Sequence, residues 1–191
     1  MRRFWWVRHA PTHQKSFVGW RDVPADLSAQ PALERLRDFL PANAAVISSD
    51  LIRARMTADA IAGARLRLAD LPGLREFNFG DWDGQHFSDV EKSHPYLSRA
   101  YWEDPGDHAP PNGESWNSAA ARINAEVDRL LATTTTDLIL VAHFGVILTQ
   151  FQRANACTAY QALSQSIDNL SVTCLTHDAT GWQVELVNQI L

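Results

Sequence analysis

The chain has 191 residues, 46% of them hydrophobic, and a formal net charge of −5 at pH 7. This size and hydrophobic content suit one well-packed α/β domain. The acidic balance excludes a nucleic-acid surface, since no basic stripe occurs, and the apolar run after the first residues is too short for a signal peptide or a membrane span. We therefore expect a cytoplasmic protein with no nucleic-acid or membrane partner. Its two cysteines, Cys157 and Cys174, are predicted to be buried thiols.

The first predicted strand covers residues 4–7, which are all apolar and mostly aromatic. It ends at the charged pair Arg8 and His9, and Pro11 then stops the regular structure. Charged side chains at the end of a buried strand need compensation. In an open α/β sheet the carboxyl ends of the strands are also where ligands bind. A solvated strand end remains the alternative for these residues taken alone.

A second apolar run that ends at a histidine lies far downstream, where residues 138–142 are followed by His143. If the two runs are parallel strands of one sheet, His9 and His143 emerge at the same edge. Two histidines at equivalent strand ends, one preceded by arginine, favour a functional site.

Strand-like and helix-like segments alternate between these two strands. Ser28 is the predicted N-cap of a helix that ends before Pro41, and residues 45–48 form the next strand. Ser49 and Asp50 are predicted to cap a helix with Arg53 in its first turn, near the same sheet edge. An anion bound there would offset the unfavourable position of this cation, although a surface arginine is the alternative. Residues 66–68 give a weak third strand.

Residues 77–116 form a long, aromatic and irregular region with two short helical pieces. A loop of this length is usually functional, so we expect a substrate cap, with a satellite hydrophobic cluster as the alternative. A helix over 115–131 follows, and the segments 170–175 and 182–187 predict an antiparallel hairpin. The predicted fold is α/β, a three-layer sandwich with a mainly parallel central sheet and an antiparallel edge strand. It forms one domain, 1–191, with 77–116 as a cap-like insertion.

Several chemistries are excluded because their motifs are missing. The chain has no phosphate-binding loop of the GxxxxGK[ST] type, no GxGxxG, no GxSxG and no HExxH. His9 and His13 are four residues apart, but Pro11 prevents the helix that a metal site of this spacing would need. We expect neither a metal nor a cofactor. Two arginines and two histidines that converge in an acidic protein suit a small dianion, above all a phosphate.

Five segments between residues 8 and 145 resemble, in order, the motifs of the histidine phosphatase superfamily, which includes the cofactor-dependent phosphoglycerate mutases. Residues 8–12 resemble its RHG motif, 19–24 its GWxDxPL segment, 48–58 its SSxLxRAxxTA helix, 74–84 its LxExxxGxWEG segment and 141–145 its VSHGG motif. The segment 19–24 also resembles that of smaller members such as α-ribazole phosphatases. The resemblance implies a phosphoglycerate mutase-like fold.

The resemblance also implies a role for each matching residue. His9 would be the nucleophile and Glu76 the proton donor, while Arg8, Arg53 and a protonated His143 would hold the phosphoryl group. Further phosphate contacts are expected from Thr12, Lys15 and Phe144. Independently of the resemblance, the density of aromatic side chains near Glu76 predicts substrate contacts from Trp82 and Trp102, and the loop around Trp20 is a further candidate. Apolar neighbours such as Phe77 and Trp82 would raise the pKa of Glu76.

Three positions depart from the family pattern. Ala10 replaces the glycine after the nucleophile, and Phe144 replaces the first glycine of HGG, where a backbone N–H would survive. Lys15 stands where the mutases carry an asparagine, so it either contacts phosphate as a cation or leaves the pocket.

The expected function is that of a metal-independent phosphomonoesterase that forms a phosphohistidine intermediate. Its substrate would be a small-molecule phosphate, with α-ribazole 5'-phosphate as the candidate. Phosphoglycerate mutase activity is the first alternative, and a catalytically weak phosphate-ligand binding protein on the same scaffold is the second. The oligomeric state stays open, with a homodimer as one option.

Overall fold

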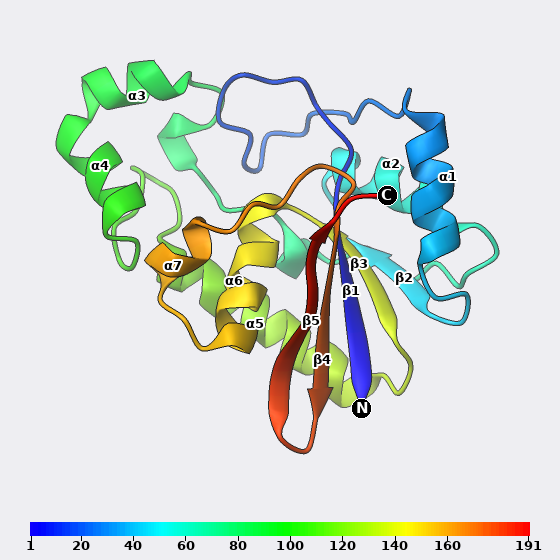
Figure 1. The fold of residues 1–191 in the computed structure, drawn as a ribbon. Coiled ribbons are helices and arrows are strands. Elements are labelled where there is room, and N and C mark those ends of the chain that lie inside the picture. Colours follow the sequence, from blue (N-terminus) through cyan, green and yellow to red (C-terminus); the bar gives the residue numbers. More distant parts are fainter.

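A five-stranded mixed sheet forms the centre of the computed structural model, which describes residues 1–191 (Figure 1). The strands lie in the order β2-β3-β1-β4-β5. They are listed with their bounds: β1 (Arg2–Arg8), β2 (Ala45–Ser48), β3 (Leu138–Ala142), β4 (Val172–Asp178) and β5 (Gly181–Gln189). β3 pairs in parallel with both β1 and β2, whereas β4 is antiparallel to both β1 and β5. Only β4 therefore runs against the other strands, which confirms the mainly parallel sheet and the antiparallel hairpin at its edge.

The weak strand predicted at residues 66–68 is not a strand of the sheet. Arg67 makes one isolated parallel bridge to Val46, with backbone hydrogen bonds on either side of it. The segment is too short to extend this pairing, so β2 remains the edge strand.

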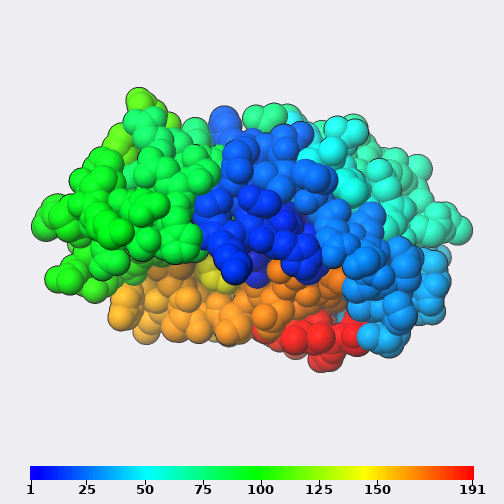
Figure 2. Space-filling view, turned by 90° about the horizontal axis from the view of Figure 1, so that it is seen from above, coloured from blue at the N-terminus to red at the C-terminus, as the bar shows by residue number.

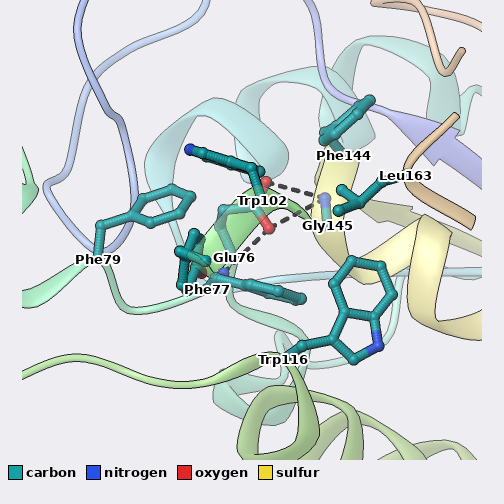
Figure 3. A pocket seen from close by; sticks show the side chains of 9 residues that line it. Glu76, Phe77, Phe79, Trp102, Trp116, Phe144, Gly145 and Leu163 are labelled. Atoms are coloured by element: carbon teal, nitrogen blue, oxygen red, sulfur yellow. Dashed lines mark hydrogen bonds between the residues drawn. The ribbon is translucent and has the colours of Figure 1, made fainter. Parts of the chain in front are cut away.

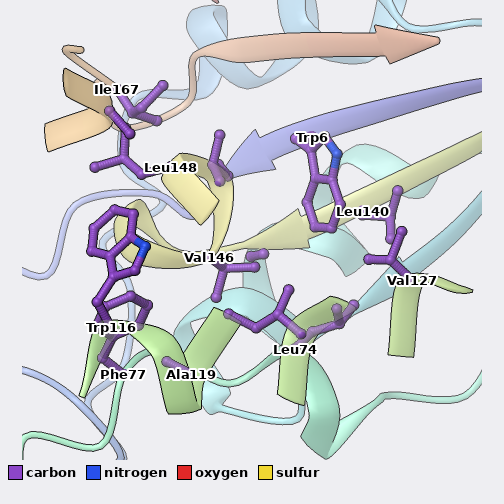
Figure 4. Packing of buried hydrophobic residues seen from close by; sticks show 14 of the residues in the cluster. Trp6, Leu74, Phe77, Trp116, Ala119, Val127, Leu140, Val146, Leu148 and Ile167 are labelled. Carbon is purple, nitrogen blue, oxygen red and sulfur yellow. The ribbon is translucent and has the colours of Figure 1, made fainter. Parts of the chain in front are cut away.

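Helices cover both faces of the sheet and produce the predicted three layers (Figure 1). On one face α1 (Gln30–Phe39) and α2 (Ile52–Ala62) pack on alternate strand residues such as Val7, Val46 and Val141. On the other face α5 (Trp116–Thr133) and α6 (Phe144–Asn155) pack on the residues between them, such as Trp6 and Leu140 (Figure 4). The sequence of a strand buried on both faces is a continuous apolar run, because successive side chains point to opposite sides of the sheet and both sides are covered.

The remaining short helices lie beyond the carboxyl ends of the parallel strands. They are α3 (Phe87–Ser93), α4 (Pro95–Glu103) and α7 (Ala159–Leu163), together with the 3₁₀ turns η1 (Pro72–Leu74) and η2 (Gly80–Trp82). Seen from above, α3 and α4 in green flank the loop that follows β1, in blue (Figure 2). The aromatic side chains of this region join the hydrophobic cluster of the α5–α6 face, so residues 77–116 and the sheet share one core.

The two predicted N-caps are wrong. α1 begins at Gln30, and the N–H of Ser28 instead binds the carboxylate of Asp26. The first N–H of α2, that of Ile52, donates to Asp22 Oδ1 at 2.6 Å. The Asp50 carboxylate is engaged by Arg75. Asp22, from the loop between β1 and α1, thus supplies the acceptor that a local capping residue would give.

The length and composition of the helices bear on membrane insertion. None of them is both long and apolar enough to span a bilayer. The thiols of Cys157 and Cys174 are both free; the prediction of a buried thiol is confirmed for Cys174 and is wrong for Cys157, which is half-buried.

Candidate active site

His9 and His143 meet at the carboxyl ends of two adjacent parallel strands, β1 and β3. The register pairs Arg8 with Ala142, so each histidine follows a paired residue. The backbone N–H of His9 donates to the Ala142 carbonyl at 3.0 Å, and the two imidazole centroids lie 5.1 Å apart. Both side chains are buried. The prediction that the two histidines emerge at one edge is confirmed.

The hydrogen bonds of His9 leave one ring nitrogen free to react. Its Nδ1 lies 2.7 Å from the Ala10 carbonyl oxygen, which can only accept, so Nδ1 carries the proton and Nε2 keeps its lone pair. Burial, together with the charges of Arg53 and Arg8, lowers the pKa of His9 to about 3. Asn169 also donates to the His9 carbonyl oxygen at 2.7 Å. His9 is therefore a neutral, oriented imidazole.

Two guanidinium groups are fixed beside this imidazole by backbone carbonyls. Arg8 Nη1 donates to the Ile167 carbonyl at 2.6 Å. Arg53 donates to the carbonyls of Gly19 at 2.7 Å and Arg21 at 3.1 Å. The Nε atoms of both arginines are buried without a partner. The pair is positioned by uncharged acceptors, so the charge of each remains available to an anion.

Ala10 fits where the family pattern has glycine. It is fully buried, and its backbone N–H donates to Thr57 Oγ1 at 2.9 Å. Thr57 Oγ1 in turn donates to the Arg53 carbonyl. The extra methyl group is therefore accommodated, and the loop after His9 is tied to the helix that carries Arg53.

Glu76 lines the same cavity as His9, and its carboxylate accepts hydrogen bonds from backbone N–H groups (Figure 3). Oε1 accepts from Phe77 at 3.0 Å and from Gly145 at 3.1 Å. A β-carbon on residue 145 would lie 2.6 Å from Oε1, so only glycine allows this approach. Burial raises the pKa of Glu76 against the opposing effect of these hydrogen bonds. The raised pKa has the direction that the sequence predicted for Glu76.

His143 is the N-cap of α6, and neither of its ring nitrogens has a hydrogen-bond partner. Burial and the nearby Arg53 lower its pKa well below the ordinary value. The expectation of a protonated His143 is therefore wrong for the free site, because a charged imidazole would lie unpaired beside arginines. A neutral His143 still offers one N–H donor to an anion.

One cavity of about 280 Å³ lies at this site, and the fully buried His143 is not among the residues that line it. Arg8, His9, Arg53 and Glu76 contribute to its wall, as do Thr12, Phe144 and Trp102. The other lining residues are Gln14, Ser16, Phe17, Val18, Phe79 and Phe87. Sequence reasoning did not single out these six as site residues. The aromatic composition of 77–116 was the only signal for Phe79 and Phe87.

Three predicted contacts are not made. Lys15 is exposed and does not line the cavity, whereas its neighbours Gln14 and Ser16 do. Trp82 is fully buried between Phe17 and Tyr101, so it supports the cap and cannot touch substrate. It also does not line the site beside Glu76, so the apolar surroundings of that carboxylate come from other side chains, Phe77 among them.

Trp20 faces away from the cavity. The central guanidinium carbons of Arg75 and Arg122 lie over its indole ring, at 5.1 and 5.8 Å from a ring centroid. Its Nε1 donates to the Glu76 carbonyl oxygen at 2.7 Å. Trp20 therefore holds the backbone of Glu76 in place, and the predicted contact with substrate is not supported because Trp20 does not line the cavity.

Metal-ligating side chains are not clustered in this chain. The described residues hold no group of three or more histidine, cysteine, aspartate or glutamate side chains placed to bind a metal ion. Arg8 and Arg53 are the cationic side chains that line the cavity.

Comparison with known proteins agrees with this geometry. The model of the histidine phosphatase superfamily (branch 1) matches residues 4–190. The adenosylcobalamin/alpha-ribazole phosphatase of Salmonella typhimurium is 29% identical over 153 residues, 76% of this chain and 75% of that protein. The bifunctional protein Rv2228c of Mycobacterium tuberculosis is 34% identical over 90% of this chain, which spans 46% of that protein.

Solved structures share the whole fold. Bacillus stearothermophilus YhfR superimposes with a TM-score of 0.90 at 23% identity, over 100% of this chain and 98% of its own. The mycobacterial glucosyl-3-phosphoglycerate phosphatase Rv2419c, in complex with inorganic phosphate, gives 0.86 at 24% identity, over 100% and 98%. The chain belongs to the histidine phosphatase superfamily, branch 1. It is a phosphoric monoester hydrolase.

Proposed function

We propose that this enzyme hydrolyses a small-molecule phosphomonoester through a phosphohistidine on His9, without a metal ion. The observation that carries the proposal is the neutral imidazole of His9, oriented through Nδ1 and set among Arg8, Arg53 and His143. An imidazole lone pair can attack phosphorus, and fixed cations can stabilise the charge on the equatorial oxygens.

The reaction then proceeds as two displacements. His9 Nε2 forms a bond to phosphorus while the bond from phosphorus to the ester oxygen breaks. The leaving alcohol takes a proton from Glu76, whose raised pKa favours the protonated carboxyl that this step needs. Water next attacks phosphorus, the P–N bond breaks, and the Glu76 carboxylate takes a proton from that water. Inorganic phosphate leaves and both side chains return to their starting states.

The substrate we propose is a phosphate ester of an aromatic or nucleoside-like alcohol, with α-ribazole 5'-phosphate as the first candidate. Relatives named alpha-ribazole phosphatase support this choice. So do the aromatic side chains around Glu76, where the leaving group must lie to receive its proton. Phe79, Phe87 and Trp102 line the cavity on this side, and flat rings stack on such surfaces.

A rapid-quench experiment tests the mechanism. Radiolabelled phenyl phosphate should label the protein with at most one phosphoryl group per chain, in a bond that acid breaks and base does not. His9→Ala should take no label and show no turnover. Label that survives acid, or that persists in His9→Ala, contradicts the phosphohistidine.

Two further assays separate this proposal from other activities. Turnover of phenyl phosphate and α-ribazole 5'-phosphate should be the same with and without excess EDTA, and a loss restored by Zn²⁺ or Mg²⁺ would show metal dependence. Phosphate binding without any turnover would indicate a binding protein. Interconversion of 2- and 3-phosphoglycerate would indicate a mutase.

A further inference from the structure

A second, smaller cavity lies directly beside the catalytic cavity and is not used by the mechanism above. It has a volume of about 30 Å³. Glu76, Phe79, Trp102 and Phe144 form part of the walls of both cavities. The other lining residues of this inner cavity are Phe77, Tyr101, Trp116, Gly145 and Leu163. Figure 3 shows how these side chains surround the Glu76 carboxylate.

The inner cavity is almost wholly apolar, and one of the residues that line it, Tyr101, carries an unused hydrogen-bond donor. Tyr101 is only 4% exposed, and its hydroxyl group has no partner. Its ring is held by edge-to-face contacts with Trp82 and Trp102, at 5.5 and 5.0 Å between centroids. A buried hydroxyl without a partner is unfavourable, and a bound acceptor removes that penalty.

Size and position limit what can enter. A volume of about 30 Å³ exceeds what one water needs but is far below what an aromatic ring fills. The adjoining catalytic cavity, at about 280 Å³, has room for a ring. Because Glu76 borders both, a leaving group that receives its proton from Glu76 lies at the entrance to the inner cavity.

We propose that the inner cavity is a specificity subsite for a small substituent on the ring of the leaving group. The substituent is of methoxy size and carries an acceptor atom that binds the Tyr101 hydroxyl. This inference rests on the proposed phosphomonoesterase function. Among aryl and nucleoside-like phosphates, the subsite therefore favours those whose ring bears such a group, whereas α-ribazole 5'-phosphate, with only methyl substituents on its ring, would gain no hydrogen bond there.

Two matched sets of substrates test the subsite. Methoxyphenyl and ethylphenyl phosphates are nearly equal in shape and in leaving-group reactivity, and differ in the acceptor oxygen. Each is prepared as its ortho, meta and para isomers, with phenyl phosphate as the reference. For one isomer, the methoxy compound should exceed the ethyl compound in kcat/KM by about 2- to 10-fold, the range of one net hydrogen bond.

Three variants make the test specific. Tyr101→Phe removes only the hydroxyl group, so it should abolish the methoxy preference while the melting temperature stays the same or rises. Leu163→Phe fills the cavity and should remove any advantage of either substituent over phenyl phosphate. Tyr96→Phe, on the same helix but 80% exposed, should change nothing.

The outcomes distinguish the subsite from the function on which it rests. Turnover of all esters with no methoxy preference at any position, or a preference that survives Tyr101→Phe, overturns the subsite. Equal loss of kcat/KM on every substrate in Tyr101→Phe does the same, because the hydroxyl group would then act on all esters alike and would not recognise the substituent. No turnover of any ester overturns the proposed function itself.

Discussion

The indole N–H of Trp20 donates a hydrogen bond to the carbonyl oxygen of Glu76 at 2.7 Å, across 56 residues of sequence. The residues on either side of Trp20 accept hydrogen bonds from Arg53 through the carbonyls of Gly19 and Arg21. The proposed proton donor, Glu76, and the proposed phosphate-binding Arg53 are therefore held by one short loop. Residues 19–21 thus fix the positions of these two side chains relative to each other.

Trp20→Phe should lower kcat several-fold with little change in KM, because the ring and its contacts with Arg75 and Arg122 remain while the bond to Glu76 is lost. A single hydrogen bond is worth about 0.5–1.5 kcal/mol. Steady-state kinetics on phenyl phosphate measures the effect. Trp182→Phe is the matched control, since Trp182 also lies under an arginine, Arg153, and its N–H has no partner. Equal kinetics in the two variants would refute the role of Trp20.

Gly145→Ala should lower kcat by an order of magnitude or more, because its β-carbon would lie 2.6 Å from Glu76 Oε1 and displace the carboxylate. General acid catalysis contributes about 10²–10⁴-fold, which sets the upper limit of the loss. Gly106→Ala, where the nearest atom is 3.8 Å away, should have normal activity. A fully active Gly145→Ala would show that the position of Glu76 tolerates this shift.

Arg53→Ala should reduce kcat/KM by an amount equivalent to about 2.7–4 kcal/mol, by analogy with the removal of one anion-stabilising donor. Arg53 is buried and its Nε is free for the anion. Inorganic phosphate should also raise the melting temperature of the wild-type protein and have a much smaller effect on this variant. An equal thermal shift in both would place the phosphate elsewhere.

Acid should destabilise the folded protein through His9 and His143. The pKa of His9 falls from 6.5 to about 3 on folding, and the pKa of His143 also falls. Below pH 6.5 these histidines bind protons in the unfolded chain but stay neutral in the folded site. The free energy of unfolding therefore decreases as the pH drops from 6.5 toward 3. The contribution of Glu76 to the free energy of unfolding has the opposite pH dependence, because a carboxyl whose pKa is raised by folding stabilises the protein less as the pH rises. Denaturant titrations of the wild type and His143→Gln should show a shallower acid slope in the variant, and identical slopes would contradict the shift.

Trp102→Ala should raise KM for aromatic phosphates more than for glycerol 3-phosphate. Trp102 lines both cavities and stacks on Phe17 at 6.2 Å between centroids. Loss of stacking is worth about 0.5–1.5 kcal/mol on aromatic substrates alone. A uniform effect on both substrate classes would assign Trp102 a purely structural role.

The sequence by itself determined the central strands, the order of the helices and the meeting of His9 with His143. The physical reason is local: apolar runs define buried strands, and parallel neighbours present their carboxyl ends at one edge. The motif order also identified Arg8, Arg53 and Glu76, all of which line the catalytic cavity.

Only the tertiary structure decided which loop side chains face that cavity. Lys15 points to solvent while Gln14 and Ser16 line the wall, and Trp82 is buried while Trp102 is half-open. Irregular segments have no fixed periodicity, so the direction in which their side chains point depends on contacts with distant residues. The hydrogen bond from Trp20 to the Glu76 carbonyl oxygen is one such contact. The unpaired hydroxyl of Tyr101 and the cap on α2 by Asp22 arise in the same way, from packing between segments far apart in the chain.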